Sequence, residues 1–504
     1  MKQDNFDIVI IGTGMGGLIC GDILSREGYR VCMLEKNKQI GGCLQIYVRE
    51  KVIFDSGVHY IGGLDKGQSL HQVFQYLGIM EKLKVKKMGL VFDKIIIGND
   101  EKEYAYAQGY ENFIKHLLVD FPGEEQALQL YCDRIKYVCS KFPLYNLRVG
   151  GRYSEKEEVL NIDTKSYIES ITSNTKLQAV LAGNNMLYAG QPGKTPFYVH
   201  AMILNSYIES SWKCLNGGAQ IAKYMARNIL DRGGMIRRNA TVKEIVVEND
   251  KVSYVLLTDD SKVFAKNFIS NIHPLKTLEM TKTNLIKNVF RNRVKSLENS
   301  ISVFTINVIF NKDSFKYRST NYYYFDEGRV WTSANYTETN WPLSYVLFFS
   351  GNTHQQEYAE SMTILTYMRF DEVKQWEATF NTIAEQDDRG DTYANFKKNK
   401  AEILLNKVSE KFPDLKTHIK SYYTSTPLTY RDYIGNDDGS MYGIVKDYKD
   451  PLRTYIPSST KLTNLYFTGQ NLNLHGILGA TMSGLLTCID FMGNDTIIEK
   501  IKNA

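Results

Sequence analysis

The chain has 504 residues, of which 43% are hydrophobic and 23% are charged, and its net charge is +5. This length exceeds one ordinary domain, so we expect two or three. The basic residues are spread along the chain, which argues against a nucleic-acid partner but leaves room for peripheral contact with an anionic membrane surface.

Seven cysteines, an odd number without a C-x-x-C pair, indicate neither a disulfide framework nor a zinc site. We therefore expect no metal and a reducing, cytoplasmic environment. We expect no leader before the first strand, which is predicted near Phe6, and no run of 18 apolar residues is present. A membrane-spanning helix is not expected, although association with a membrane surface stays open.

The amino-terminal stretch "FDIVIIGTGMGGLICGDILSREGYRVCMLEK" predicts a dinucleotide-binding unit. Its apolar run Phe6 to Ile11 is typical of a buried parallel strand, and residues 18–24 continue as a helix before a second buried strand. The helix N-terminus, with Gly12, Gly14, Met15, Gly16 and Gly17, is expected to face a pyrophosphate through free N–H groups. Gly12 makes the turn, Gly14 admits the phosphates, and Gly17 lets helix and strand pack closely.

Glu35 follows Gly17 by 18 residues, where a carboxylate can bind a ribose hydroxyl. "EKNKQIGGC" then brings Lys36, Gly41, Gly42 and Cys43. A plain NAD-dependent dehydrogenase does not need this second glycine pair, whereas many FAD enzymes have one that passes the flavin phosphates and ribityl chain. FAD is therefore the expected cofactor.

Three glycines, a histidine and a tyrosine occur together in "FDSGVHYIGG", residues 54–63. Such glycine density lets a backbone approach a ligand closely. Gly57, Val58 and His59 are expected beside the flavin ring. His59, with an ordinary pKa of about 6.5, suits proton transfer near neutral pH. A structural role, in which His59 bonds a backbone carbonyl, stays open. Asp55 is interpreted as a hydrogen-bond acceptor that fixes the loop.

The middle of the chain predicts a helix and a hairpin. Ile221, Met225 and Ile229 fall on one helical face, beside Ala222, Ala226 and Leu230, and "TVKEIVVENDKVSYVLLT" then alternates as two strands. The aromatic runs "NYYYF" and "SYVLFFS" are candidates to line an apolar cavity, although ordinary core is an equal alternative. "NLIKNVFRNRVKSL" is a basic amphipathic helix that either packs normally or contacts a membrane surface.

The carboxy-terminal "NLYFTGQNLNLHGILGATMSGLLT" predicts a short strand, a turn at Gly469 and Gln470, and a closely packed helix starting near Gly476. The N–H groups at this helix start would stabilise the negative charge of a reduced flavin.

These motifs together resemble the carotenoid desaturase, carotenoid isomerase and retinol saturase group of FAD proteins over nearly the whole chain. "GGC" and "FDSGVHYIGG" are most similar to the retinol saturase branch, since desaturases usually carry arginine where this chain has Cys43. "STPLTYRDYIGNDDGSMYG" resembles another segment of the family. The resemblance implies that Val242 contacts adenine through its backbone and that Ile477 and Leu478 lie near the flavin ring.

The expected fold is α/β. A Rossmann-like FAD-binding domain of the glutathione-reductase/amine-oxidase type would be assembled from residues 1–90, 210–275 and 425–504. An interleaved α+β substrate domain would comprise residues 91–209 and 276–424.

The resemblance implies an FAD-dependent oxidoreductase that saturates a C=C bond of an apolar polyene or isoprenoid lipid, with an electron donor that the sequence does not identify. Candidate proton donors are His59, Tyr60, Tyr442 and His475. Cis–trans isomerisation and desaturation by the same FAD site are the alternatives. A non-catalytic lipid carrier like the Rab GDP-dissociation inhibitors is a third hypothesis, which the intact fingerprint with Glu35 disfavours.

Overall fold

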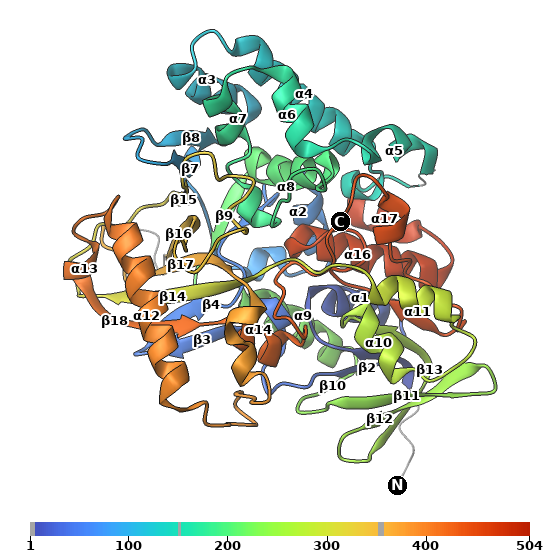
Figure 1. Ribbon diagram of the computed structural model, residues 1–504. Helices are drawn as coiled ribbons and strands as arrows, with labels where there is room; N and C mark the ends of the chain where they lie inside the picture. The colour runs from blue at the N-terminus through green and yellow to red at the C-terminus, as the bar shows by residue number, and fades with distance from the viewer. Residues whose placement is uncertain (1–5, 150–152, 351–356) are drawn as a thin grey trace.

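The computed structural model describes residues 6–149, 153–350 and 357–504 (Figure 1). Two seven-stranded sheets organise these residues. The first has the order β10-β2-β1-β13-β12-β11, with β19 paired to β13. Its strands are β1 (Phe6–Ile11), β2 (Val31–Leu34), β10 (Met235–Arg237), β11 (Val242–Glu248), β12 (Lys251–Leu257), β13 (Lys262–Ser270) and β19 (Leu465–Phe467).

Strand β1 lies at the centre of this first sheet and is buried on both faces. Ile8 and Ile10 point into a core with the helices α1 (Met15–Arg26), α9 (Ala219–Asp231) and α16 (Gly476–Met492). Val9 and Ile11 point into the opposite core, which β11 and β12 cover. Strands covered on both faces read as continuous apolar runs rather than alternating ones, which explains the sequence of β1. This sheet is the expected Rossmann-like fold.

The second sheet has the order β18-β14-β17-β16-β15-β7-β8. Its strands β14 (Ser302–Phe310), β15 (Asn321–Phe325) and β17 (Ser361–Met368) are buried at every position. The others are β7 (Val91–Ile97), β8 (Tyr104–Ala107), β16 (Ser344–Ser350) and β18 (Ile419–Ser425). Residues far apart in sequence thus share one sheet, because β15 pairs in parallel with β7 and antiparallel with β16.

Helices surround the second sheet. Figure 1 shows α3 to α8 together at the top of the molecule. Their bounds are α3 (Tyr110–Asp120), α4 (Glu125–Ser140), α5 (Tyr153–Leu160), α6 (Thr164–Ile171), α7 (Thr175–Leu181) and α8 (Phe197–Glu209). On another side lie α12 (Gly390–Ser409) and α14 (Pro427–Ile434). Two smaller sheets complete the fold. One is the hairpin of β3 (Ile46–Arg49) and β4 (Val52–Asp55), and the other has the order β5 (Ile61–Gly62), β9 (Ser211–Cys214) and β6 (Val85–Lys87).

Two details differ from the sequence expectations. Leu230, placed on the buried face of the middle helix, is 49% exposed, because it follows Ile229 by one position and turns away from the core of α9. The basic amphipathic segment forms only an eight-residue helix, α11 (Asn288–Lys295), in which Val294 is buried and Val289 is exposed. Contact of this segment with a membrane surface stays a prediction.

The proposed domain limits also stay a prediction. Leu278 of α10 (Pro274–Met280) and Val294 of α11 pack in the core beneath the first sheet, beyond the expected limit at residue 275. In the three described stretches, no helix has both the length and the apolar character to cross a bilayer.

Candidate functional site

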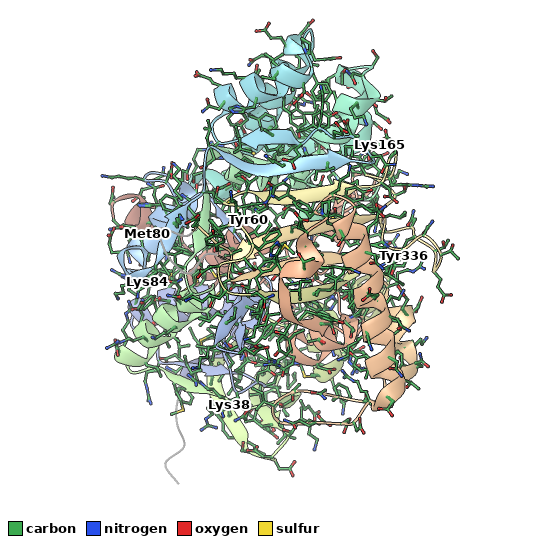
Figure 2. The ribbon with its side chains drawn as sticks, turned by 90° about the vertical axis from the view of Figure 1, so that its left-hand side faces the viewer. Lys38, Tyr60, Met80, Lys84, Lys165 and Tyr336 are labelled. Carbon is green, nitrogen blue, oxygen red and sulfur yellow. The ribbon has the colours of Figure 1, made fainter. Side chains whose placement is uncertain are left out.

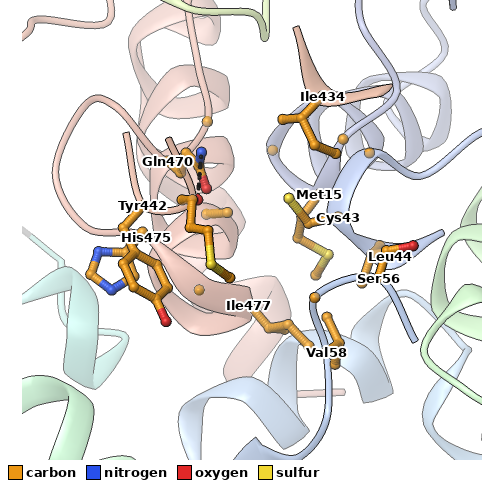
Figure 3. Close-up of a pocket in the computed structure, with 18 of the residues that line it drawn as sticks. Met15, Cys43, Leu44, Ser56, Val58, Ile434, Tyr442, Gln470, His475 and Ile477 are labelled. Carbon is orange, nitrogen blue, oxygen red and sulfur yellow. Dashed lines mark hydrogen bonds between the residues drawn. The ribbon is translucent and has the colours of Figure 1, made fainter. Parts of the chain in front are cut away.

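A cavity of about 550 Å³ lies between the two sheets. Separated segments of the chain line it: the first strand–helix turn, the loops around Gly42 and Gly57, the helix α8, the second sheet, the helix α14 and the start of α16. Figure 3 shows Met15, Cys43 and Val58 on one side and Gln470, Tyr442 and His475 on the other.

All four expected proton donors line this cavity, as do all the expected cofactor-binding residues except Gly17. The expected residues that line it are Gly12, Gly14, Met15, Gly16, Glu35, Lys36, Gly41, Gly42, Cys43, Gly57, Val58, His59, Tyr60, Val242, Tyr442, Gly469, Gln470, His475, Gly476, Ile477 and Leu478. Gly17 packs instead: a methyl group there would lie 2.4 Å from the carbonyl oxygen of Gly12.

At one end of the cavity, the backbone of the first strand–helix turn lies very close to the backbone of the segments at Gly42 and Gly469. A methyl group on Gly16 would lie 2.7 Å from the Cα atom of Gly469, and one on Gly42 would lie 3.1 Å from the Cα atom of Gly14. Side chains at these positions would fill the space beside the N-terminus of α1. The free N–H groups of such a helix start form a cradle for phosphates, so this end fits a dinucleotide.

Glu35 is held firmly at the edge of this cradle. Its Oε1 atom accepts a hydrogen bond of 2.9 Å from the Asn37 amide, and its Oε2 atom accepts bonds from the amide and hydroxyl of Thr13. The Thr13 hydroxyl also accepts a bond of 3.1 Å from the Gly41 amide. Thr13, which the sequence interpretation did not select, therefore ties both glycine segments to the acid.

Lys36 and Asn271 complete the polar end. The Lys36 ammonium donates a 2.7 Å bond to the Asp432 carbonyl, and burial lowers its pKa to about 8. The Asn271 side chain stands beside the glycine turn, since a methyl group on Gly14 would lie 2.8 Å from its Nδ2 atom. Asn271 was also missed by the sequence interpretation, and it directly follows the strand β13.

The loop with Gly57 closes over Cys43. A methyl group on Gly57 would lie 3.3 Å from the Cβ atom of Cys43, and burial raises the pKa of the Cys43 thiol to about 11. The thiol is therefore protonated at neutral pH. Asp55 accepts a 2.7 Å bond from the Gly218 amide, which connects this loop to the start of α9.

At the carboxy-terminal side, the first turn of α16 opens onto the cavity. His475 precedes the helix and makes a 2.9 Å bond from Nε2 to the Leu187 carbonyl, and its ring lies 4.5 Å from that of Tyr442. The Tyr442 hydroxyl donates a 2.8 Å bond to the Met186 carbonyl. Both candidate proton donors thus hold the loop at residues 186–187, and burial lowers the pKa of His475 to about 4.

The other end of the cavity is apolar. Tyr323, Val346 and Leu365 are cross-strand neighbours on one face of the second sheet, and Phe348 follows on that face. Met202, Ile203 and Tyr207 of α8 lie opposite. Both aromatic runs that were candidates for a cavity wall therefore contribute to it.

His59 stacks on Phe348, with ring centroids 4.3 Å apart and planes 7° from parallel. Burial, together with the charge of Lys213, lowers the pKa of His59 to about 4. The expectation that His59 keeps its ordinary pKa near 6.5 is wrong, because burial against Phe348 and the nearby charge of Lys213 both disfavour its cation. At neutral pH the imidazole is uncharged.

Tyr60 is part of a buried polar cluster, and Figure 2 labels it inside the molecule. Its hydroxyl donates a 2.9 Å bond to Asp93 Oδ2 and lies 2.7 Å from the Tyr323 hydroxyl. Asn184 and Asn321 also donate to Asp93. The sequence interpretation missed Asp93, since a single acid within the apolar strand "VFDKIII" gives no signal of its partners.

Comparisons with known proteins agree with this geometry. Residues 10–77 match the family described as NAD(P)-binding Rossmann-like domain. All-trans-retinol 13,14-reductase of Danio rerio is 24% identical, with 96% of this chain and 85% of the relative covered. Chloroplastic prolycopene isomerase of Daucus carota is 23% identical, with 99% and 82% covered.

Solved structures show the same fold. An oxidoreductase from Methanosarcina mazei superposes with a TM-score of 0.65 at 14% identity, covering 97% of this chain and 100% of that one. Putrescine oxidase bound to putrescine gives a TM-score of 0.62 at 13% identity, covering 97% and 99%. The α/β fold with a Rossmann-like unit is thereby confirmed, and a flavin or nucleotide cofactor fits it.

Proposed function

We propose that this chain is an FAD-dependent oxidoreductase that saturates a C=C bond of an apolar polyene or isoprenoid lipid. Its similarity over most of its length to retinol reductases, and to prolycopene isomerases of the carotenoid desaturase/isomerase family, supports this proposal. The observation that carries this proposal is the continuity of one cavity, which runs from the glycine cradle and Glu35 to an apolar wall on the second sheet.

FAD would be held along the polar part of this cavity. The glycines at 12, 14 and 16 would receive the pyrophosphate, Glu35 the ribose, and the backbone at Val242 the adenine. Gly42, Cys43 and Gly57 would follow the ribityl chain, and the first turn of α16 would face the ring. When bound and reduced, FAD supplies a hydride to one carbon of the substrate.

The apolar wall would orient the lipid and exclude water. Tyr207, Tyr323 and Phe348 present large apolar surfaces, and flexible Met202 adapts to an irregular chain. The stacked, uncharged His59 suits the same task, since it adds a flat ring without a cation. A polyene would therefore be positioned mainly by shape and burial.

Reconstitution with FAD tests the proposal. The FAD-loaded protein would be reduced without oxygen and mixed with all-trans-retinol and with longer polyenes, while flavin absorbance and product mass are followed. Reoxidation with a product two mass units heavier is the expected result. An unchanged mass with altered elution would identify an isomerase, and a loss of two mass units by the oxidised protein would identify a desaturase.

A matched variant separates cofactor chemistry from background reduction. Gly16→Val would place a branched side chain against the Gly469 backbone and is expected to abolish FAD retention. Protein that is colourless after FAD loading in its wild-type form would contradict the proposal and favour a lipid carrier.

A further inference from the structure

Asp93 is the most completely enclosed acid near the cavity. Its side chain is fully buried on β7, and all three of its hydrogen-bond donors are uncharged: Tyr60 at 2.9 Å, Asn184 at 2.8 Å and Asn321 at 2.9 Å. The described residues include no cation in an ion pair with it. A purely structural acceptor of these bonds needs no charge, and an asparagine would avoid the cost of burying a carboxylate.

A chain of hydroxyl groups leads from Asp93 to the apolar end of the cavity. The Tyr60 hydroxyl contacts both Asp93 and, at 2.7 Å, the Tyr323 hydroxyl, and both tyrosines line the cavity. With Asp93 ionised, Tyr323 donates to Tyr60 and Tyr60 donates to Asp93. With Asp93 protonated, the direction can reverse, because each hydroxyl is both donor and acceptor, and the Tyr323 proton is then free to point into the cavity.

We propose that Asp93, Tyr60 and Tyr323 form a proton-delivery chain in which Tyr323 gives a proton to the substrate and Asp93 replaces it through Tyr60. This inference rests on the proposed reduction of a C=C bond. One alkene carbon gains the hydride that the reduced flavin supplies, and its neighbour forms a C–H bond with the Tyr323 proton. Tyr323 is reprotonated by Tyr60 and Tyr60 by Asp93, which leaves a carboxylate that takes a proton from solvent after product release.

The charge state of Asp93 suits this task. Burial raises its pKa to about 7, although its hydrogen bonds and the positive charge of Lys213 act in the opposite direction. Other titratable groups that face it are the hydroxyls of Tyr60, Tyr323, Tyr106 and Tyr207, all with pKa values raised by burial. Lys213 donates its own 2.9 Å bond to the Phe349 carbonyl, and burial lowers its pKa to about 7.

Three variants interrupt the chain at successive positions: Asp93→Asn, Tyr60→Phe and Tyr323→Phe. In single-turnover reactions of the FAD-loaded, reduced protein, each is expected to slow substrate reduction by about 10²-fold or more, the usual contribution of a general acid. Tyr345→Phe is the matched control, because it removes a buried hydroxyl of the same sheet that has no partner among the described residues.

The dependence on pH distinguishes proton delivery from a structural role. The wild-type rate should be constant below pH 7 and fall about tenfold per pH unit above it, since the donor must carry its proton. Asp93→Asn should lose this titration. Lys213→Met should move it to higher pH, because removing a nearby cation raises the pKa of Asp93.

Infrared spectroscopy provides a readout that does not depend on turnover. The difference between wild type and Asp93→Asn should contain a protonated-carboxyl C=O band that disappears as the pH rises through 7. The spectrum of Asp93→Asn must be subtracted because burial also raises the pKa of Asp55 to about 7, so Asp55 would contribute a carboxyl band over the same pH range in both proteins.

The outcomes separate the two proposals. If wild-type protein saturates a polyene but the three variants react as fast as Tyr345→Phe, the proton-delivery chain is overturned and the proposed function stands. If wild-type protein saturates a polyene but no band assigned to Asp93 titrates near neutrality, the chain alone is likewise overturned. If wild-type protein saturates no polyene, the proposed function fails, and the proton-delivery chain fails with it.

Discussion

At the scale of single residues, the site depends on a few polar side chains whose partners are fixed by the fold. Glu35 keeps both carboxylate oxygens engaged, one by Asn37 and one by Thr13, and so presents a fixed negative charge at the cradle. A carboxylate that accepts from N–H and O–H donors is held more rigidly than a free surface acid, and it can accept a ribose hydroxyl through its remaining lone pairs.

Glu35→Gln preserves the shape of this side chain and removes its charge. We expect FAD affinity to fall about 10- to 100-fold, because hydrogen bonds to a charged group contribute roughly 1.5–3 kcal/mol. Fluorescence titration of the apoprotein with FAD measures the change. Glu27→Gln is the control, since Glu27 lies outside the cavity lining and pairs with Lys500 and the Tyr76 hydroxyl instead. An equal loss in both variants would remove Glu35 from the binding site.

Asp93 should also make stability depend on pH. The pKa of Asp93 is about 7 in the folded protein, whereas the ordinary value of an aspartate in an unfolded chain is 3.8. Between pH 3.8 and pH 7 the folded state therefore binds a proton that the unfolded chain has released. Stability from this group is therefore greatest at low pH, is lost as the pH rises from 4 to 7, and is constant above. The unfolding temperature of Asp93→Asn relative to wild type should rise over that range. A constant difference would show that Asp93 is ionised throughout.

These residues also show what the sequence could and could not predict. The glycines at 12, 14 and 16 and the acid at 35 belong to one local strand–turn–helix–strand unit. Their spacing in the sequence is therefore enough to predict that they lie close together in the fold. Asp93 depends on Tyr60, Asn184 and Asn321, which are 33, 91 and 228 positions away, and such contacts follow from sheet pairing. The pKa of His59 was likewise beyond the sequence, because Phe348 and Lys213 reach it only in the fold.

At the scale of elements, the helix α14 contributes to the cavity wall and is attached to the helix α12. Tyr430 and Ile434 line the cavity, and the helix starts at a capping box in which the Thr426 hydroxyl accepts from the Leu428 amide at 3.2 Å. The same hydroxyl lies 2.8 Å from that of Tyr393 on α12. One side chain thus caps α14 and fastens it to its neighbour.

Thr426→Ala should destabilise the protein by about 1 kcal/mol, because an N-cap bond is lost and the Tyr393 hydroxyl is left without this partner. Thr426→Ser keeps the hydroxyl and should retain most of the stability. Thermal unfolding of both variants checks this expectation. If serine were as destabilising as alanine, the methyl group of Thr426 rather than its cap bond would be responsible.

At the scale of the whole molecule, the unit of β1, α1 and β2 is predictable from local patterns, whereas the strand order of the second sheet is not. Its strands come from residues 91–107, 302–368 and 419–425, and their order depends on pairings between distant segments. The cavity lies where these two parts meet, so a ligand that fills it touches residues from both. Binding should therefore stabilise the entire assembly rather than one unit.

FAD should raise the unfolding temperature of the whole chain in a single step. At a free concentration of 100 times Kd, a ligand that binds only the folded state contributes about 2.7 kcal/mol. NAD+ shares the ADP portion but lacks the ribityl chain and flavin that the loops at Gly42, Gly57 and Gly476 would hold, so its effect should be much smaller. Calorimetry with FAD, NAD+ and ADP compares them directly. Equal stabilisation by NAD+ and FAD would mean that only the Rossmann-like unit binds the ligand, and a second unfolding step unaffected by FAD would mean that the second sheet does not contribute to the site.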